Sequence, residues 1–342
     1  MEAGMNRLAF KRHSSSRAFA SGLCLGAFIL APAAAVADES GVSFWLPGLF
    51  GSLAAVPQQP GPALATIYYH TGVEAGRNIS FQHGVSIVAG VAATGDLAII
   101  IPSYVFETPV FGGQFTVGMM SVVGNADVSA SAQLTGPMGN FMGGGRNEGV
   151  TGVGDLYPQA LLRWNMGTNN IMIYVTGDAP VGNYNAQRLA NLGLGHSAVD
   201  GGLGYTYFDP QTGHEFSAVG GLTYNFINPT TDVRSGVDFH LDWAASQFIT
   251  KQVQAGVVGY VYDQISADGG AGNRVGAFES RVIGLGPQLG FIFPVGDHQG
   301  YINLKAYKEF AARNRPDGWD LWLTFSITPA PPSETPKPMV TK

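Results

Sequence analysis

The chain has 342 residues, of which 12% are charged and 48 are glycine, and its formal net charge is −6. Soluble domains carry about 25% charged residues and ~7% glycine, so this composition argues against an ordinary water-facing surface. An acidic chain also lacks the basic surface that nucleic-acid binding needs. Hydrophobic residues make up 45%, yet beyond residue 40 no apolar run reaches the ~18 residues of a membrane-spanning helix. Abundant apolar residues without long runs are typical of a transmembrane β-barrel, whose strands alternate apolar and polar side chains.

Residues 1–37 are expected to be a signal peptide. Four basic residues precede an apolar stretch over 18–30, and Ala35-Val36-Ala37 gives the small-x-small pattern of a cleavage site. The alternative is an anchor helix that stays attached. Cys24 is the only cysteine, so its removal with the signal would leave no disulfide and no cysteine-based zinc site.

Residues 38–61 form a lead-in before the first predicted strand. Within it, residues 44–57 are apolar but interrupted by proline and glycine, which makes a poor strand and a poor helix. Two interpretations stay open: a mobile lead-in, or an apolar plug inside the barrel near its periplasmic mouth. The plug or gate candidates are Phe44, Trp45, Leu46, Pro47, Leu49 and Phe50.

Strand-like segments fill residues 62–328 and predict an antiparallel up-and-down transmembrane β-barrel. Alternation is weaker in the first half of this region than in the second. Fourteen segments are candidate strands, and bacterial single-chain barrels have an even number of strands. Because two weak early segments could be loop or plug, we predict twelve strands, with fourteen as the alternative. The weaker segments are 62–72, 84–92, 95–106, 114–123, 126–134, 153–165, 169–178 and 198–208.

The clearest alternation runs from Val237 to Ser246. One face carries large apolar side chains and the other carries Asp238, His240 and Asp242. We expect the polar face to line a wet lumen, with its carboxylates paired to basic groups. The alternative is half of an acid/base or metal site, but no nucleophile, phosphate-binding or zinc motif accompanies it, so we predict no catalytic residue, cofactor or metal. The lumen-lining candidates are Arg163, Asp238, His240, Asp242, Arg281 and Lys305.

Turn-forming residues divide these strands. Short turns are expected at 93–96, 166–169, 209–213 and 294–297, and longer outer loops at 135–152, 179–197 and 263–277. Residues 185–194 could form a short helix. The Pro-rich residues 329–342 are expected to be a disordered tail.

Several long runs also resemble one known family. They include FWLPGLFGSLAAVP at 44–57, VDFHLDWAASQF at 237–248 and GWDLWLTFSITP at 318–329. These runs resemble the outer-membrane family called the meta-pathway of phenol degradation protein, over nearly all of 41–328. The resemblance implies a channel or transporter for small hydrophobic or aromatic compounds, and it carries over no site residues.

On this interpretation the protein is a monomer in contact with outer-membrane lipid. It is expected to reach the outer membrane of a Gram-negative bacterium by Sec-type export. Two other functions stay open: an enzyme acting on a lipid or ester through the Asp238/His240/Asp242 face, and a structural or adhesive barrel. A soluble β-sandwich is the alternative fold.

Overall fold

The computed structural model describes residues 43–80, 86–135, 141–273, 276 and 279–331. The predicted signal peptide over 1–37 lies outside these ranges, as does most of the predicted tail. Among the described residues, no helix is long and apolar enough to cross a membrane.

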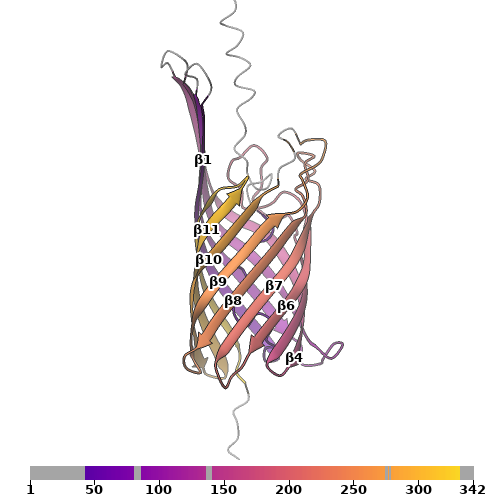
Figure 1. Cartoon of the computed structure of the whole chain (residues 1–342). Helices are drawn as coiled ribbons and strands as arrows, with labels where there is room; N and C mark the ends of the chain where they lie inside the picture. Colours follow the sequence, from indigo (N-terminus) through magenta and orange to yellow (C-terminus); the bar gives the residue numbers. More distant parts are fainter. Residues whose placement is uncertain (1–42, 81–85, 136–140, 274–275, 277–278, 332–342) are drawn as a thin grey trace, which may run out of the picture. The chain divides into compact units, whose positions relative to one another are not determined.

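Twelve antiparallel strands close into one barrel, in which each strand pairs with its sequence neighbours and β1 pairs with β12 (Figure 1). The predicted fold and the count of twelve are therefore confirmed. The strands are β1 (Gly61–Ser80), β2 (Ser86–Val105), β3 (Gln114–Thr135), β4 (Phe141–Met166), β5 (Asn169–Gly177), β6 (Ala198–Phe208), β7 (His214–Asn225), β8 (Asp238–Phe248), β9 (Val253–Gln264), β10 (Arg281–Val295), β11 (His298–Arg313) and β12 (Asp317–Pro329).

The two faces of the strands differ as the alternation predicts. On β8, Asp238, His240 and Asp242 are at most 2% exposed, whereas the apolar residues between them are only partly buried. Large apolar side chains are exposed on the other strands as well, for example Leu203 at 65% and Leu289 at 58%. An apolar exterior around a polar interior is the pattern of a barrel whose outer face meets lipid.

Two predicted connections in the first half are wrong. Residues 93–96 are not a turn but the middle of β2, where Gly95 pairs with Thr71 on one side and Ala126 on the other. Segments 114–123 and 126–134 likewise form the single strand β3. Gly124 marks a close approach of neighbouring backbones: a Cβ there would lie 2.1 Å from the carbonyl oxygen of Asp96.

The predicted loop over 135–152 is also wrong in its second part, since residues 141–152 belong to β4 and pair with β3. The helix predicted over 185–194 does not form, and this stretch contains turns and bends. The short turns near 166–169, 209–213 and 294–297 are confirmed.

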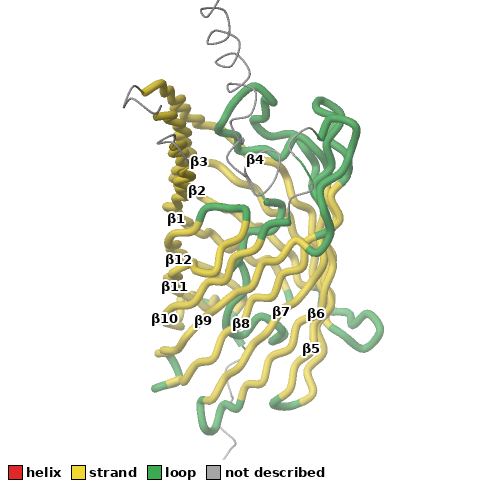
Figure 2. The backbone as a smooth tube through the Cα atoms, turned by 45° about the horizontal axis from the view of Figure 1, so that its top comes forward, coloured by secondary structure: helices red, strands yellow, loops and turns green. Residues whose placement is uncertain are grey.

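Short turns gather at one end of the barrel and longer connections at the other (Figure 2). β4 pairs with β5 only from Gln159 to Met166, next to the short turn that joins them, so the part of β4 toward the end with longer connections extends beyond β5. The connection after β5 covers part of the remaining edge of β4. The backbone amide of Asn183 donates to the carbonyl of Val153 (2.8 Å), and the backbone amide of Gly182 donates to Oδ1 of Asp155 (2.6 Å). The wall is thus completed there by a loop rather than by a strand.

Candidate functional site

The segment that precedes β1 lies against side chains of the lumen wall. Oδ1 and Oδ2 of Asp242, on β8, accept hydrogen bonds from the amides of Gly48 (2.8 Å) and Phe50 (3.0 Å). From β11, Nζ of Lys305 donates to the carbonyl of Gly48, and to those of Leu49 and Phe50 at 3.3 Å each. The backbone of 48–50 is therefore held between one anion and one cation.

A second carboxylate holds the following residues. Glu215, on β7 and 4% exposed, accepts from the amide of Leu53 (3.0 Å) and from the hydroxyl of Ser52 (2.8 Å). Two residues further on, the amide of Ala55 donates to Oγ1 of Thr206 on β6 (3.0 Å). The interrupted apolar stretch forms no regular element of its own, so wall side chains serve its backbone groups instead, as buried backbone requires.

Aromatic packing holds the start of the segment. The ring of Trp45 is stacked on His240, with centroids 3.7 Å apart and 13° between the planes. Nε2 of His240 lies 2.9 Å from Oδ2 of Asp200 on β6 and 3.3 Å from the hydroxyl of Tyr174 on β5. Because His240 is fully buried beneath Trp45, no substrate can reach its ring while the segment occupies this position.

The segment leaves part of the lumen empty. A cavity of about 400 Å³ lies between residues 49–59 and the strands β1 to β4 and β10 to β12. Its apolar lining includes Ile67, Ile101 and Leu161, and its polar lining includes Arg163 and Asn303. An eight-stranded barrel is filled by its own side chains, whereas a barrel of twelve strands has room for both a chain segment and a cavity.

The structure brings four of the six lumen-lining candidates to this segment: His240, Asp242, Lys305 and Arg163, whose Nε donates to the carbonyl of Ala54 (3.2 Å). Asp238 is on the same face of β8, but its Oδ2 accepts from Asn225 (2.9 Å) on β7. Arg281 is the first residue of β10 and lies on the same face of this strand as Ile283 and Leu285, whose side chains point outward. The alternation therefore does not place Arg281 in the lumen with the other candidates.

The expected pairing of lumen carboxylates with basic groups is wrong for Asp242. Among the described residues, no ion pair joins it to Arg163, Arg281 or Lys305. Its oxygens accept from backbone amides instead, because the segment brings N–H groups that lie closer than any cationic side chain.

Sequence reasoning missed Glu215, Thr206 and Asp200 as site residues. Glu215 could have been found, because it precedes the outward-facing Phe216 in an alternating strand and therefore places a carboxylate on the polar face. Asp200 gave a weaker signal, because three glycines, Gly201, Gly202 and Gly204, follow it closely and dilute the alternation of β6.

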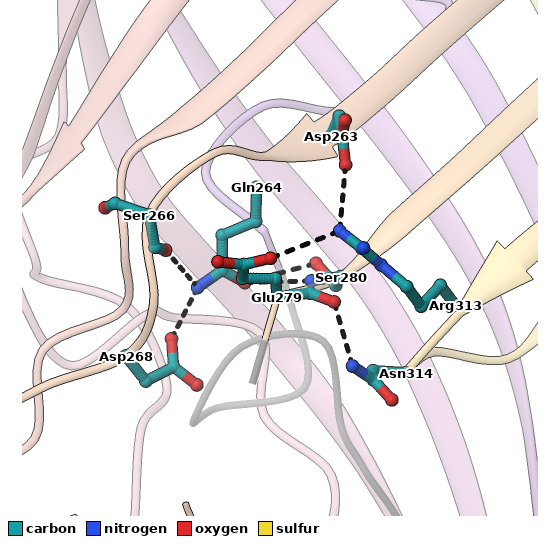
Figure 3. A network of polar contacts seen from close by, with 8 residues as sticks. All are labelled: Asp263, Gln264, Ser266, Asp268, Glu279, Ser280, Arg313 and Asn314. Carbon is teal, nitrogen blue, oxygen red and sulfur yellow. Dashed lines mark hydrogen bonds and ion pairs between the residues drawn. The ribbon is translucent and has the colours of Figure 1, made fainter. Parts of the chain in front are cut away.

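A separate polar network joins the connections at the opposite end from the short turns (Figure 3). Arg313 lies 3.4 Å from both Asp263 and Glu279, and the side-chain amide of Asn314 donates to the carbonyl of Glu279 (2.9 Å). Gln264 donates to Asp268 (2.7 Å). These contacts tie the β9–β10 connection to the β11–β12 connection. No group of acidic, histidine or cysteine side chains in the described part of the chain has the arrangement of a metal site.

Comparison with known proteins gives one matching family and one solved structure of similar fold. The family described as "Putative MetA-pathway of phenol degradation" matches residues 76–325. The crystal structure of the COG4313 outer membrane channel from Pseudomonas putida F1 is similar, with a TM-score of 0.56, 16% identity, and coverage of 79% of this chain and 97% of that one. The match to a crystal structure of a FadL homologue from Pseudomonas aeruginosa covers 87% of this chain and 95% of that one, with a TM-score of 0.40 and 8% identity. No curated protein matches the sequence.

Proposed function

The chain belongs to the family described as "Putative MetA-pathway of phenol degradation", and from this premise we propose that it is an outer membrane channel for small hydrophobic or aromatic compounds. The proposal includes a location in the outer membrane of a Gram-negative bacterium after Sec-type export, and function as a single barrel. It assigns no catalytic step to the protein.

One observation carries this proposal: a closed barrel with an apolar exterior encloses a lumen that its amino-terminal segment fills only in part, beside a cavity of about 400 Å³. A structural barrel needs no internal space, whereas a passage for small molecules does. Small-molecule sites commonly occupy ~300–1,000 Å³, and their walls are mostly apolar with a few polar groups.

We further propose that residues 44–56 act as the gate. Their hold on the wall depends on a small number of polar contacts from Asp242, Lys305, Glu215 and Thr206, together with the stacking of Trp45. Outer membrane barrels have short turns on the periplasmic side, so the end with the turns near 209–213 would face the periplasm.

Deletion of 44–56 tests the gate. The deletion variant, reconstituted in liposomes, is expected to admit a neutral aromatic solute that the bare bilayer excludes, such as phenyl glucoside, faster than the complete protein, measured as swelling rate. Unchanged swelling would contradict the gate, and absence of swelling for both proteins would contradict the channel.

A disulfide gives a sharper version of the same test. Because the amide of Ala55 lies 3.0 Å from Oγ1 of Thr206, cysteines are introduced in place of both residues to tie the segment to β6, and loss of free thiols on oxidation confirms that the disulfide has formed. The oxidised double variant is expected to pass less solute than the same protein after reduction. Equal flux in the two redox states would mean that the segment does not control passage.

A further inference from the structure

Arg163 is a buried cation without a carboxylate partner. It lies on β4, is 7% exposed, and donates to two neutral acceptors: the carbonyl of Ala54 (3.2 Å) and Oγ1 of Thr116 (3.4 Å). No ion pair among the described residues includes Arg163. A buried charge is costly unless it is paired, so a lone arginine in a lumen wall calls for an explanation.

The cavity next to Arg163 has an asymmetric charge. Arg163 and Lys305 both line it, and no aspartate or glutamate is among its lining residues. The ammonium group of Lys305 donates to the carbonyls of residues 48–50, and the carboxylate of Asp242 binds amides of the same stretch. This nearby carboxylate offsets part of the positive charge of Lys305. Arg163 has no such neighbour, and it is therefore the stronger centre of positive potential in the cavity.

The remaining lining suits a molecule with an apolar body. Leu49, Ile67, Ile101 and Leu161 supply hydrophobic surface, while neutral polar groups such as Gln159 offer hydrogen bonds. An arginine guanidinium presents donors in a planar fork that matches a carboxylate. Apolar walls around one fork-shaped cation favour a small organic anion over both a sugar and a simple inorganic ion.

We propose that this cavity binds small aromatic monocarboxylates, with the anionic group at Arg163 and the apolar body against β1 and β2. This inference names the solute class of the channel proposed above and rests on that proposal. It makes Arg163 the residue that determines charge preference, while the segment 44–56 controls access.

Binding to the purified full-length protein in detergent tests the inference. Benzoate, benzamide and acetate form a matched set: benzamide keeps the ring and removes the charge, and acetate keeps the charge and removes the ring. Benzoate is expected to bind at least about tenfold more tightly than benzamide, since hydrogen bonds to charged groups are roughly twice as strong as neutral ones. It is expected to exceed acetate by a similar factor, because acetate has no ring to contact the apolar walls. Equal binding of benzoate and benzamide, measured by titration calorimetry, would overturn the proposal, and so would equal binding of benzoate and acetate.

Two variants locate the effect. Arg163→Gln removes the charge. Thr116→Asp keeps Arg163 but places a carboxylate beside it, because the hydroxyl of Thr116 lies 3.4 Å from Nη1 of Arg163 in the unmodified protein. Both are expected to abolish the preference for benzoate over benzamide. Lys251→Gln removes one positive charge from the exposed turn after β8 and is expected to leave the preference unchanged. A heat-modifiable band on gels checks that each variant folds.

The outcomes separate this inference from the channel proposal. If liposomes containing the protein admit benzamide but binding shows no charge preference, the channel stands and the anion site is wrong. If benzoate binds preferentially but no solute crosses, the site stands and the channel is wrong. A preference that persists in both Arg163→Gln and Thr116→Asp would assign it to another part of the protein.

Discussion

The lumen has two unlike walls. On the anchoring wall, formed by β6, β7 and β8, the carboxylates of Glu215 and Asp242 accept from amides of the amino-terminal segment. On the cavity wall, formed by β1 to β4 and β10 to β12, the lining side chains carry no carboxylate and leave space. The barrel thus uses buried charge on the anchoring wall to hold its own chain, whereas the charge of Arg163 on the cavity wall has no carboxylate partner among the ion pairs of the described residues. Charge that is satisfied by backbone amides fixes a segment, and charge that is left unpaired is available to a ligand.

The largest expected change to this comparison comes from Trp45→Ala. Trp45 is 3% exposed and stacks on His240, and truncation of a buried aromatic side chain costs about 3–5 kcal/mol. We expect the segment to leave the anchoring wall for much of the time, which would raise single-channel conductance.

Trp319→Ala is the matched control, because Trp319 is 48% exposed and on the opposite face of β12 from the buried Trp322. It removes the same atoms without touching the segment. If both variants conduct like the unmodified protein, the stacking of Trp45 does not hold the gate.

Asp242→Asn is expected to have a smaller effect of the same sign. Asparagine has one acceptor oxygen in place of two, so one of the amides of Gly48 and Phe50 loses its partner. A hydrogen bond to a charged group contributes ~1.5–3 kcal/mol, which corresponds to at least about a tenfold shift toward the released segment. Liposome swelling with a neutral aromatic solute measures it, with Asp297→Asn in the exposed β10–β11 turn as the control. Equal swelling of the Asp242 and Asp297 variants would count against the anchoring role.

The part of this site that could be predicted follows from local periodicity. Strict alternation on β8 identified Asp238, His240 and Asp242 as lumen residues. The count of twelve is right for a different reason than expected: no early segment is a loop or plug, and four of the fourteen candidate segments join in pairs to form β2 and β3. Where glycine breaks the periodicity, as at Gly95 and Gly124, prediction introduced a turn or a break into a continuous strand. Glycine serves turns and close backbone approaches equally well, and one sequence does not distinguish them.

The contacts of the segment could not be predicted in the same way. Gly48 and Asp242 are 194 residues apart, and nothing in the composition of 44–57 indicates which wall side chains its backbone will meet. Plug and lead-in therefore stayed as equal interpretations. The partnership of His240 with Asp200 was hidden for a related reason, since it depends on the register of β6 and β7 with β8 rather than on either sequence alone.

Glu215→Gln is expected to weaken the anchoring wall less than Asp242→Asn. The amide oxygen of glutamine can still accept from Leu53, so the main loss is the charge-assisted part of the contacts with Ser52 and Leu53, about 1 kcal/mol. Swelling should rise only a fewfold. Because Glu215 and Asp242 hold different residues of the segment, the double variant should show the sum of the two free-energy changes, and a strong departure from additivity would mean that the two contacts act as one unit.

The smallest expected effect on solute passage concerns a loop rather than the gate: this change acts on stability, and it depends on pH. Burial, with a contribution from nearby Asp155, raises the pKa of Asp178 to about 8, just after the end of β5. The unfolded chain releases this proton near pH 4 whereas the folded protein keeps it up to about pH 8, so stability from this group is complete below pH 4 and is lost as the pH rises to 8. Asp178→Asn copies the protonated form. Its heat-modification temperature should match that of the unmodified protein at pH 4 and exceed it at pH 8.5, whereas Asp297→Asn should show no such divergence. Parallel curves for the Asp178 variant and the unmodified protein would mean that this carboxyl is ionised in the folded barrel.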